Sequence, residues 1–175
     1  MRYVALLRGI NVGGKNMIKM GPLRELLSGM GFDNVASYVN SGNLAFDTRK
    51  TDDDKLAERI HNEIEQKLGF DVSVMVRSVD EINNVIANNP YDGQFDSHKD
   101  LHVFFLKERM SAEQEKMLLE KNSDVEKISV KGREIYYLLK ISIIDSVLGK
   151  GFIDKKLKVP ATARNWRTVT KLAEL

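Results

Sequence analysis

Two glycines followed by a lysine, shortly after an apolar run, form the first feature with a chemical interpretation. The segment Gly9-Ile10-Asn11-Val12-Gly13-Gly14-Lys15 matches the G-x4-G-K spacing of a phosphate-binding loop. Asn16, however, stands where that loop needs Ser or Thr to hold magnesium. The next helical pattern begins only near Gly21-Pro22, whereas the lysine of such a loop lies at the start of its helix. The sequence therefore disfavours a nucleotide-hydrolase site here.

A looser anion site remains open at the same loop. Gly13 and Gly14 expose backbone amides, and Arg8 and Lys15 supply positive charge. The alternative is a loop whose glycines serve backbone geometry alone.

A second polar group is the segment Asn40-Ser41-Gly42-Asn43. Its simplest role is a turn, because Asn and Gly tolerate left-handed backbone conformations. In the fold predicted below, the strand before the glycine loop pairs antiparallel with the strand after this turn, so the loop and the turn meet. We therefore expect one polar corner lined by Arg8, Asn11, Asn40, Ser41 and Asn43.

Positive charge is concentrated in two segments, although the whole sequence has a net charge of only +2. Residues 1–24 hold five basic side chains and no acid, and residues 150–171 hold seven basic side chains and one acid. The second segment contains Arg164 and Asn165, which join the candidate ligand-binding residues. If folding unites the segments, they attract nucleic acid or a phosphate-bearing small molecule. If it does not, they are ordinary solvated faces.

Several other chemistries are excluded or disfavoured. The sequence has no cysteine, which rules out disulfides, thiolate zinc sites and cysteine nucleophiles. His98 and His102 are four residues apart, but their segment passes from loop to strand, where this spacing does not place both on one helix face. No Ser–His–Asp arrangement can be identified from spacing. We predict no metal and no cofactor.

Membrane insertion is also disfavoured. The apolar run at residues 4–7 stops at Arg8, and no stretch approaches the ~20 apolar residues of a spanning helix. We predict a cytoplasmic protein without a membrane partner, and the sequence leaves self-association open.

The order of elements predicts the architecture. Residues 2–10 form a strand, 23–30 a helix, 35–40 and 43–48 a hairpin, 52–68 a helix and 72–76 a strand, which is the split βαβ order. After a helix at 79–86, the order repeats with a strand at 101–106, a helix at 111–121, a hairpin at 125–139, a helix at 142–148 and a short strand at 156–159. A helix over 162–175 ends the sequence.

We therefore predict an α+β protein with two ferredoxin-like subdomains and a C-terminal helix. The subdomains span residues 1–78 and 100–160, the bridging helix and loop span 79–99, and the last helix lies within 161–175. The two halves share this order without convincing residue identity. RNA-recognition domains have the same fold, but strand 43–48 carries one aromatic residue and no leading basic residue, which disfavours their base-stacking mode.

Three ordered stretches resemble the bacterial family called domain of unknown function 1697. They are residues 6–16, residues 38–44 and residues 162–169, which read LLRGINVGGKN, YVNSGNL and TARNWRTV. The resemblance spans nearly the whole sequence and implies a pair of ferredoxin-like α+β subdomains, in agreement with the element order. It implies no reaction, because the family has no assigned activity.

The leading functional hypothesis is an anion-binding protein that takes nucleic acid or a phosphate-bearing small molecule. The candidate ligand-binding residues are Arg8, Asn11, Gly13, Gly14, Lys15, Asn40, Ser41, Asn43, Arg164 and Asn165. A small metal-independent enzyme and a structural or self-associating module remain alternatives. The sequence does not decide whether the protein is an enzyme.

Overall fold

The computed structural model describes all 175 residues. The chain forms two compact units, which we call the N-terminal unit (residues 1–84 and 171–175) and the C-terminal unit (residues 85–170). Each contains a four-stranded antiparallel sheet and helices, which confirms the predicted α+β fold class. None of the helices is long and apolar enough to span a membrane.

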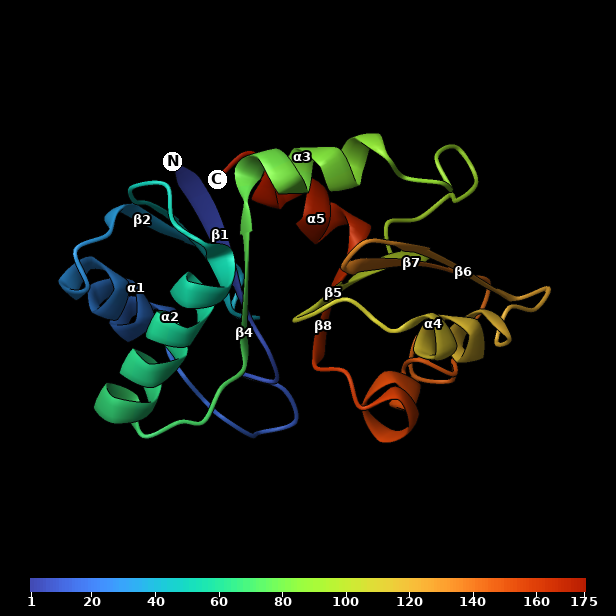
Figure 1. Cartoon of the computed structure of the whole chain (residues 1–175), viewed down its shortest axis with the longest axis horizontal. Coiled ribbons are helices and arrows are strands. Elements are labelled where there is room, and N and C mark those ends of the chain that lie inside the picture. The colour runs from blue at the N-terminus through green and yellow to red at the C-terminus, as the bar shows by residue number, and fades with distance from the viewer. The chain divides into compact units, whose positions relative to one another are not determined.

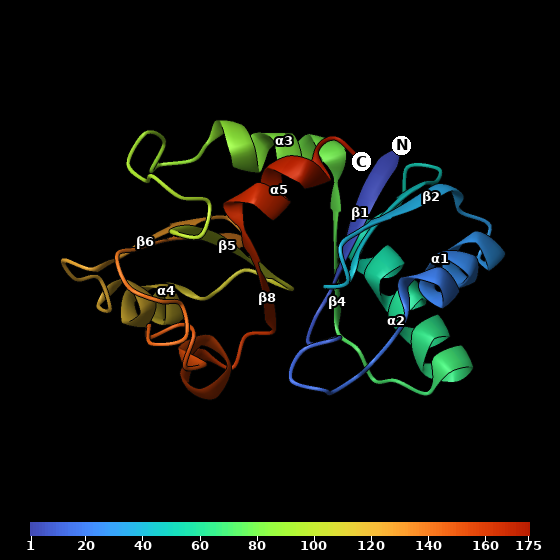
Figure 2. The ribbon, with the colours of Figure 1, turned by 180° about the vertical axis from the view of Figure 1, so that it is seen from behind.

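The N-terminal unit has the strand order β2-β3-β1-β4. Helices α1 and α2 lie on the same face of this sheet (Figures 1 and 2), where they enclose an apolar core. Its elements are β1 (Arg2–Leu7), α1 (Met20–Gly29), β2 (Asp33–Tyr38), β3 (Asn43–Asp47), α2 (Asp53–Leu68) and β4 (Val74–Ser78).

Local sequence explains the bounds of α2. The Asp52 carboxylate accepts hydrogen bonds from the backbone N–H groups of Asp54 and Lys55, which caps the first turn. Gly69 ends the helix at a φ of 73°, in the left-handed region where glycine meets no steric penalty. Between these ends, Leu56, Ile60 and Ile64 face the core at helical spacing.

The C-terminal unit repeats the same plan with the strand order β6-β7-β5-β8. Helix α4 and the short helix η1 pack on one face of its sheet, around a second apolar core. The elements after β4 are α3 (Val79–Ala87), β5 (Leu101–Leu106), α4 (Ala112–Leu119), β6 (Glu126–Lys131), β7 (Glu134–Leu139), η1 (Ile153–Leu157), β8 (Ala161–Asn165) and α5 (Trp166–Leu172).

The end of the chain differs from the predicted elements. Residues 142–148 form turns rather than a helix, because the hydroxyls of Ser142 and Ser146 bond to nearby backbone groups in place of a helical ladder. The last strand lies at residues 161–165 rather than 156–159, and the last helix begins at Trp166 rather than near residue 162.

The central strands of the two sheets, β1 and β5, pair with their neighbours in corresponding registers. Tyr3 of β1 pairs with Phe46 and Ser78, and at the corresponding place His102 of β5 pairs with Tyr137 and Asn165. One residue earlier in the last strand of each sheet, a buried arginine, Arg77 or Arg164, donates to the carbonyl of the residue before it. The helix that follows is capped by Ser78 in one unit and by Asn165 in the other. The two units thus place residues with matching roles at corresponding positions of one shared topology.

Candidate functional site

The glycine loop and the Asn40 turn meet in the N-terminal unit. We call residues 9–17 and 39–42 the N-terminal corner. The Asn11 amide nitrogen donates to the carbonyl oxygens of Ile18, at 2.8 Å, and Asn40, at 2.7 Å. The Asn11 amide oxygen accepts from Ile18 N at 2.8 Å, and Asn11 N donates to Asn16 O. Asn11 therefore closes the loop on itself and fastens it to the turn.

Contacts with the end of β1 and with the Asn43 side chain hold the turn in place. Leu7 N donates to Gly42 O at 2.8 Å, and a Cβ added to Gly42 would lie 2.7 Å from Leu7 Cβ. Asn43 is buried, and its amide nitrogen donates to Tyr38 O and to the Ser41 hydroxyl. Asn43 therefore holds the turn rather than facing solvent.

Left-handed backbone is concentrated at the N-terminal corner. Seven of the fourteen residues with a positive φ in the chain lie in it. The least expected is Val39, at a φ of 50°, since a β-branched side chain clashes with the backbone in this region. The positive-φ residues of the corner are Gly9, Asn11, Gly13, Gly14, Asn16, Val39 and Gly42.

The outer part of the corner faces solvent. Lys15 is exposed, whereas Arg8 is half-buried. Val12 and Met17 are each 64% exposed, which is unusual for apolar side chains in a braced loop. The corner thus presents an exposed lysine and two apolar side chains on a loop that Asn11 fastens to the turn.

Arg164 and Asn165, the remaining predicted ligand-binding residues, lie in the C-terminal unit. Arg164 is buried in β8, where it donates to the Thr162 hydroxyl at 2.7 Å and to Ala163 O at 2.8 Å. Burial lowers the pKa of its guanidinium to about 10, so it stays charged at neutral pH. Asn165 caps α5 through its side-chain oxygen, which accepts from Thr168 N at 3.0 Å.

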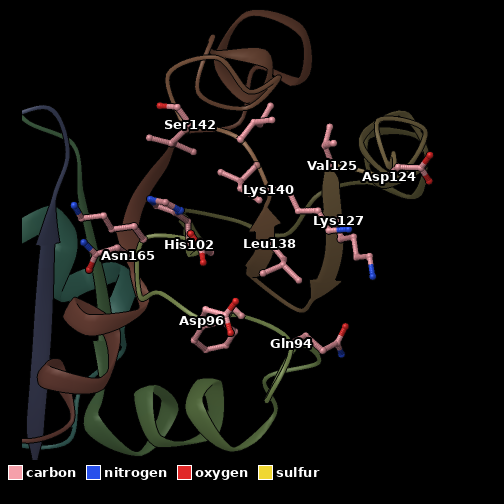
Figure 3. A pocket seen from close by; sticks show the side chains of 16 residues that line it. Gln94, Asp96, His102, Asp124, Val125, Lys127, Leu138, Lys140, Ser142 and Asn165 are labelled. Carbon is pink, nitrogen blue, oxygen red and sulfur yellow. The ribbon is translucent and has the colours of Figure 1, made fainter.

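Asn165 also lines a pocket of about 930 Å³ in the C-terminal unit. The pocket lies where β5 and β6 begin and where β7 and β8 end (Figure 3). The loop at residues 94–100 forms one wall and residues 140–143 form another. Figure 3 shows His102 and Asn165 at one end, and Asp124 with Lys127 at the other.

His102 is the polar residue that β5 contributes to this pocket. Its Nδ1 is buried and has no hydrogen-bond partner. Burial lowers the pKa of the imidazole below its ordinary value of 6.5, and the charge of Asp100 opposes this shift only in part. His102 is therefore a neutral imidazole at neutral pH.

A buried network supports the core beside the pocket. The Tyr137 hydroxyl donates to the buried Glu126 carboxylate, which also accepts from Val147 N at 3.2 Å. Burial, and then the hydrogen bond to Glu126, raises the pKa of the Tyr137 hydroxyl to about 12. Tyr137 lies directly opposite His102 in the sheet, so this network fixes one neighbour of the imidazole.

Sequence reasoning missed the pocket. His102 is the one polar residue in the otherwise apolar strand Leu101-His-Val-Phe-Phe-Leu106, and that interruption was the available signal. The structure groups no three His, Asp or Glu side chains in a geometry suited to a metal ion.

Comparisons with known proteins place the chain in a family. A solved conserved bacterial protein from Streptococcus pneumoniae is similar over 99% of this chain and 97% of its own, with 27% identity and a TM-score of 0.76. Curated proteins gave no match. The model of the family described as "Protein of unknown function (DUF1697)" matches residues 1–136, which include the N-terminal corner but not the stretch at 162–169. The chain belongs to this DUF1697 family, as the resemblance predicted.

Proposed function

We propose that the N-terminal corner binds an anionic ligand, either nucleic acid or a phosphate-bearing small molecule. The observation that carries this proposal is the concentration of left-handed backbone on an exposed loop. Such conformations cost of order 1–3 kcal/mol each for residues other than glycine, and they cluster at functional sites where the surroundings hold them in place.

Packing does not account for the loop glycines. A Cβ added to Gly9, Gly13 or Gly14 would meet no atom within 4 Å. These residues are needed for their φ angles alone, which turn the backbone of an exposed segment without burying anything. The amides of Asn11 and Lys15 already donate within the loop, so the exposed backbone of Val12, Gly13 and Gly14 supplies the amide groups for an anion.

The charge of the segment supports an anion rather than a cation. Of the basic residues in 1–24, Arg2 is paired with Asp47 at 3.2 Å, whereas Lys15 and Lys19 are exposed on the loop and just after it. No acidic residue lies within residues 1–24 to oppose them. The proposal rests on this first basic segment and does not require the second.

A titration at two salt concentrations tests the proposal. Labelled single- and double-stranded DNA, RNA, and nucleoside triphosphates are titrated with the wild type, Lys15→Ala and Lys67→Ala. Lys67 is an exposed lysine in the last turn of α2, so its loss changes the net charge equally without touching the corner.

Lys15→Ala is expected to weaken binding and to reduce the slope of log affinity against log salt by about 1, while Lys67→Ala leaves both unchanged. Binding that is absent at low salt, or that both variants weaken equally, contradicts the proposal.

A further inference from the structure

The shared topology shows what is unusual about the pocket of the C-terminal unit. Tyr3 occupies the place in β1 that His102 occupies in β5. The Tyr3 hydroxyl donates to Thr51 O at 2.8 Å and accepts from Thr51 N at 3.0 Å, and its ring stacks on Phe46. In the N-terminal unit, therefore, a tyrosine fills this position and its hydroxyl has its hydrogen-bond partners. A smaller hollow of about 640 Å³ at the same end includes Asp47 and Arg59, but Tyr3 does not line it.

In the C-terminal unit the same place is left open and polar. His102 has an unpartnered buried Nδ1, which is tolerated more readily as an acceptor than as an N–H donor. This favours the tautomer with the proton on Nε2. The oxygen of the Asn165 side chain accepts the hydrogen bond that caps α5, whereas its amide nitrogen remains available to donate. This end of the pocket thus offers neutral hydrogen-bond donors.

One wall of the pocket is aromatic and fixed. The half-buried ring of Phe95 lines the pocket and is held edge-on by Trp166, with ring centroids 6.3 Å apart and an interplanar angle of 73°. The remaining apolar surface comes from the ends of β6 and β7 and the segment after β7, through Val125, Leu138, Leu139, Ile141 and Ile143. An aromatic wall with apolar surroundings suits a flat ligand, because stacked rings attract each other beyond simple area burial.

The charges around the pocket are balanced. The lining contains three lysines and three aspartates, and His102 is neutral; the charged residues are Lys99, Lys127, Lys140, Asp96, Asp100 and Asp124. A lining without net charge gives no preference for an anion or a cation. The pocket therefore differs in its selectivity from the N-terminal corner.

We propose that this pocket binds an uncharged planar heterocycle with a hydrogen-bonding edge, that is, a nucleobase or nucleoside. The edge faces His102 and Asn165, and the flat face lies against Phe95. A pocket of this size holds such a molecule with its sugar, since ligand sites commonly span ~300–1,000 Å³. This site is independent of the anion site proposed above.

Calorimetric titration with adenosine, guanosine, cytidine and uridine, each also as its 5′-monophosphate, tests the proposal. At least one nucleoside is expected to bind, with an affinity independent of salt and no tighter for the monophosphate. Failure of all four nucleosides to bind at millimolar concentration overturns the proposal. So does a preference for the monophosphate that salt removes and that Lys15→Ala, which weakens the separate anion site of the N-terminal corner, leaves unchanged.

Three variants test whether the ligand binds in the pocket. His102→Tyr introduces the residue of the corresponding place in β1 and is expected to weaken binding at least tenfold, because the longer ring takes the space beside Asn165 that the base edge would occupy. Asn165→Ser keeps a capping residue, as Ser78 shows in the other unit, but removes the amide donors; about a tenfold loss is expected. Lys127→Ala, at the exposed far end, is expected to change affinity less than twofold.

Unfolding temperatures separate loss of the site from loss of the fold. His102→Tyr and Asn165→Ser are expected to unfold close to the wild type. Nucleoside binding that both of these folded variants retain in full contradicts the assignment of the site.

Discussion

The two candidate sites belong to two sheets of the same topology, and they lie at opposite ends of the corresponding strands. The N-terminal corner follows the end of β1, whereas the pocket opens at the start of β5. The corner is closed by its own polar groups: Asn11 and Asn43 spend their amides on backbone carbonyls, and only the loop surface remains available. The pocket is instead lined by side chains, among them His102, whose Nδ1 is buried without a partner, and Asn165. A duplicated fold can thus offer two unlike sites, one made of backbone and one made of side chains.

The largest effect is expected from a substitution beside the pocket. A Cβ added to Gly149 would lie 1.6 Å from the carbonyl oxygen of Ile143, a residue of the pocket wall. Because the obstacle is backbone, Gly149→Ala is expected to lower the free energy of unfolding by at least about 3 kcal/mol. Urea denaturation measures it. A change below about 1 kcal/mol would show that the wall at residues 140–143 moves freely, and that the pocket is less rigid than the corner.

Two glycines of the N-terminal corner distinguish the cost of a steric clash from the cost of a left-handed backbone. Gly42→Ala meets both Leu7 and a φ of 79°, and is expected to destabilise the protein by roughly 2–4 kcal/mol. Gly14→Ala has a similar φ of 74° but no atom within 4 Å, so about 1 kcal/mol is expected. Equal losses in thermal or urea unfolding would mean that the contact between loop and turn is looser than the structure shows.

Exchanging the corresponding residues of the two sheets tests the comparison directly. Tyr3→His removes both hydrogen bonds to Thr51 and the stacking on Phe46, and is expected to destabilise the protein by roughly 2–3 kcal/mol. His102→Tyr is expected to be neutral within about 1 kcal/mol, since the pocket has room for the larger ring. Denaturant midpoints of the two variants measure the asymmetry, and equal midpoints refute it.

The smallest effect is expected from pH. Burial holds the pKa of His102 below 6.5, so below that pH the unfolded chain takes up the proton before the folded chain does. The stability that depends on the neutral imidazole is therefore present above pH 6.5 and lost as the pH falls toward the folded-state pKa. Unfolding temperatures at pH 7.5 and pH 5.5 are expected to differ more for the wild type than for His102→Gln. An equal difference would place the imidazole in contact with water.

Much of the fold was predictable because local signals agreed with it. The Asp52 cap, the apolar spacing of α2 and the hairpin at Gly42 each specify their own element, and the predicted meeting of Asn11 with Asn40 follows from antiparallel pairing. The boundary between β8 and α5 was wrong because Ala163, Trp166 and Val169 have helical spacing across it. The local sequence pattern gives no sign that Arg164 is buried in a sheet.

The pocket was not predictable for a different reason. Phe95, Leu138 and Ile143 come together only through tertiary structure, and none belongs to a short motif. The correspondence between the two units was hidden because Arg77 and Arg164 are single matching positions among unlike neighbours. The union of the two basic segments and the binding roles of the ten candidate residues stay predictions.

The N-terminal unit is completed by residues that are synthesised after the C-terminal unit. The Arg2 Nε donates to Leu175 O at 2.8 Å, and residues 171–175 belong to the N-terminal unit although they follow the whole C-terminal unit. On the ribosome, where domains generally fold from the N-terminus onward, the first unit to emerge is therefore finished last. Until then the nascent chain carries an N-terminal unit that lacks its closing segment.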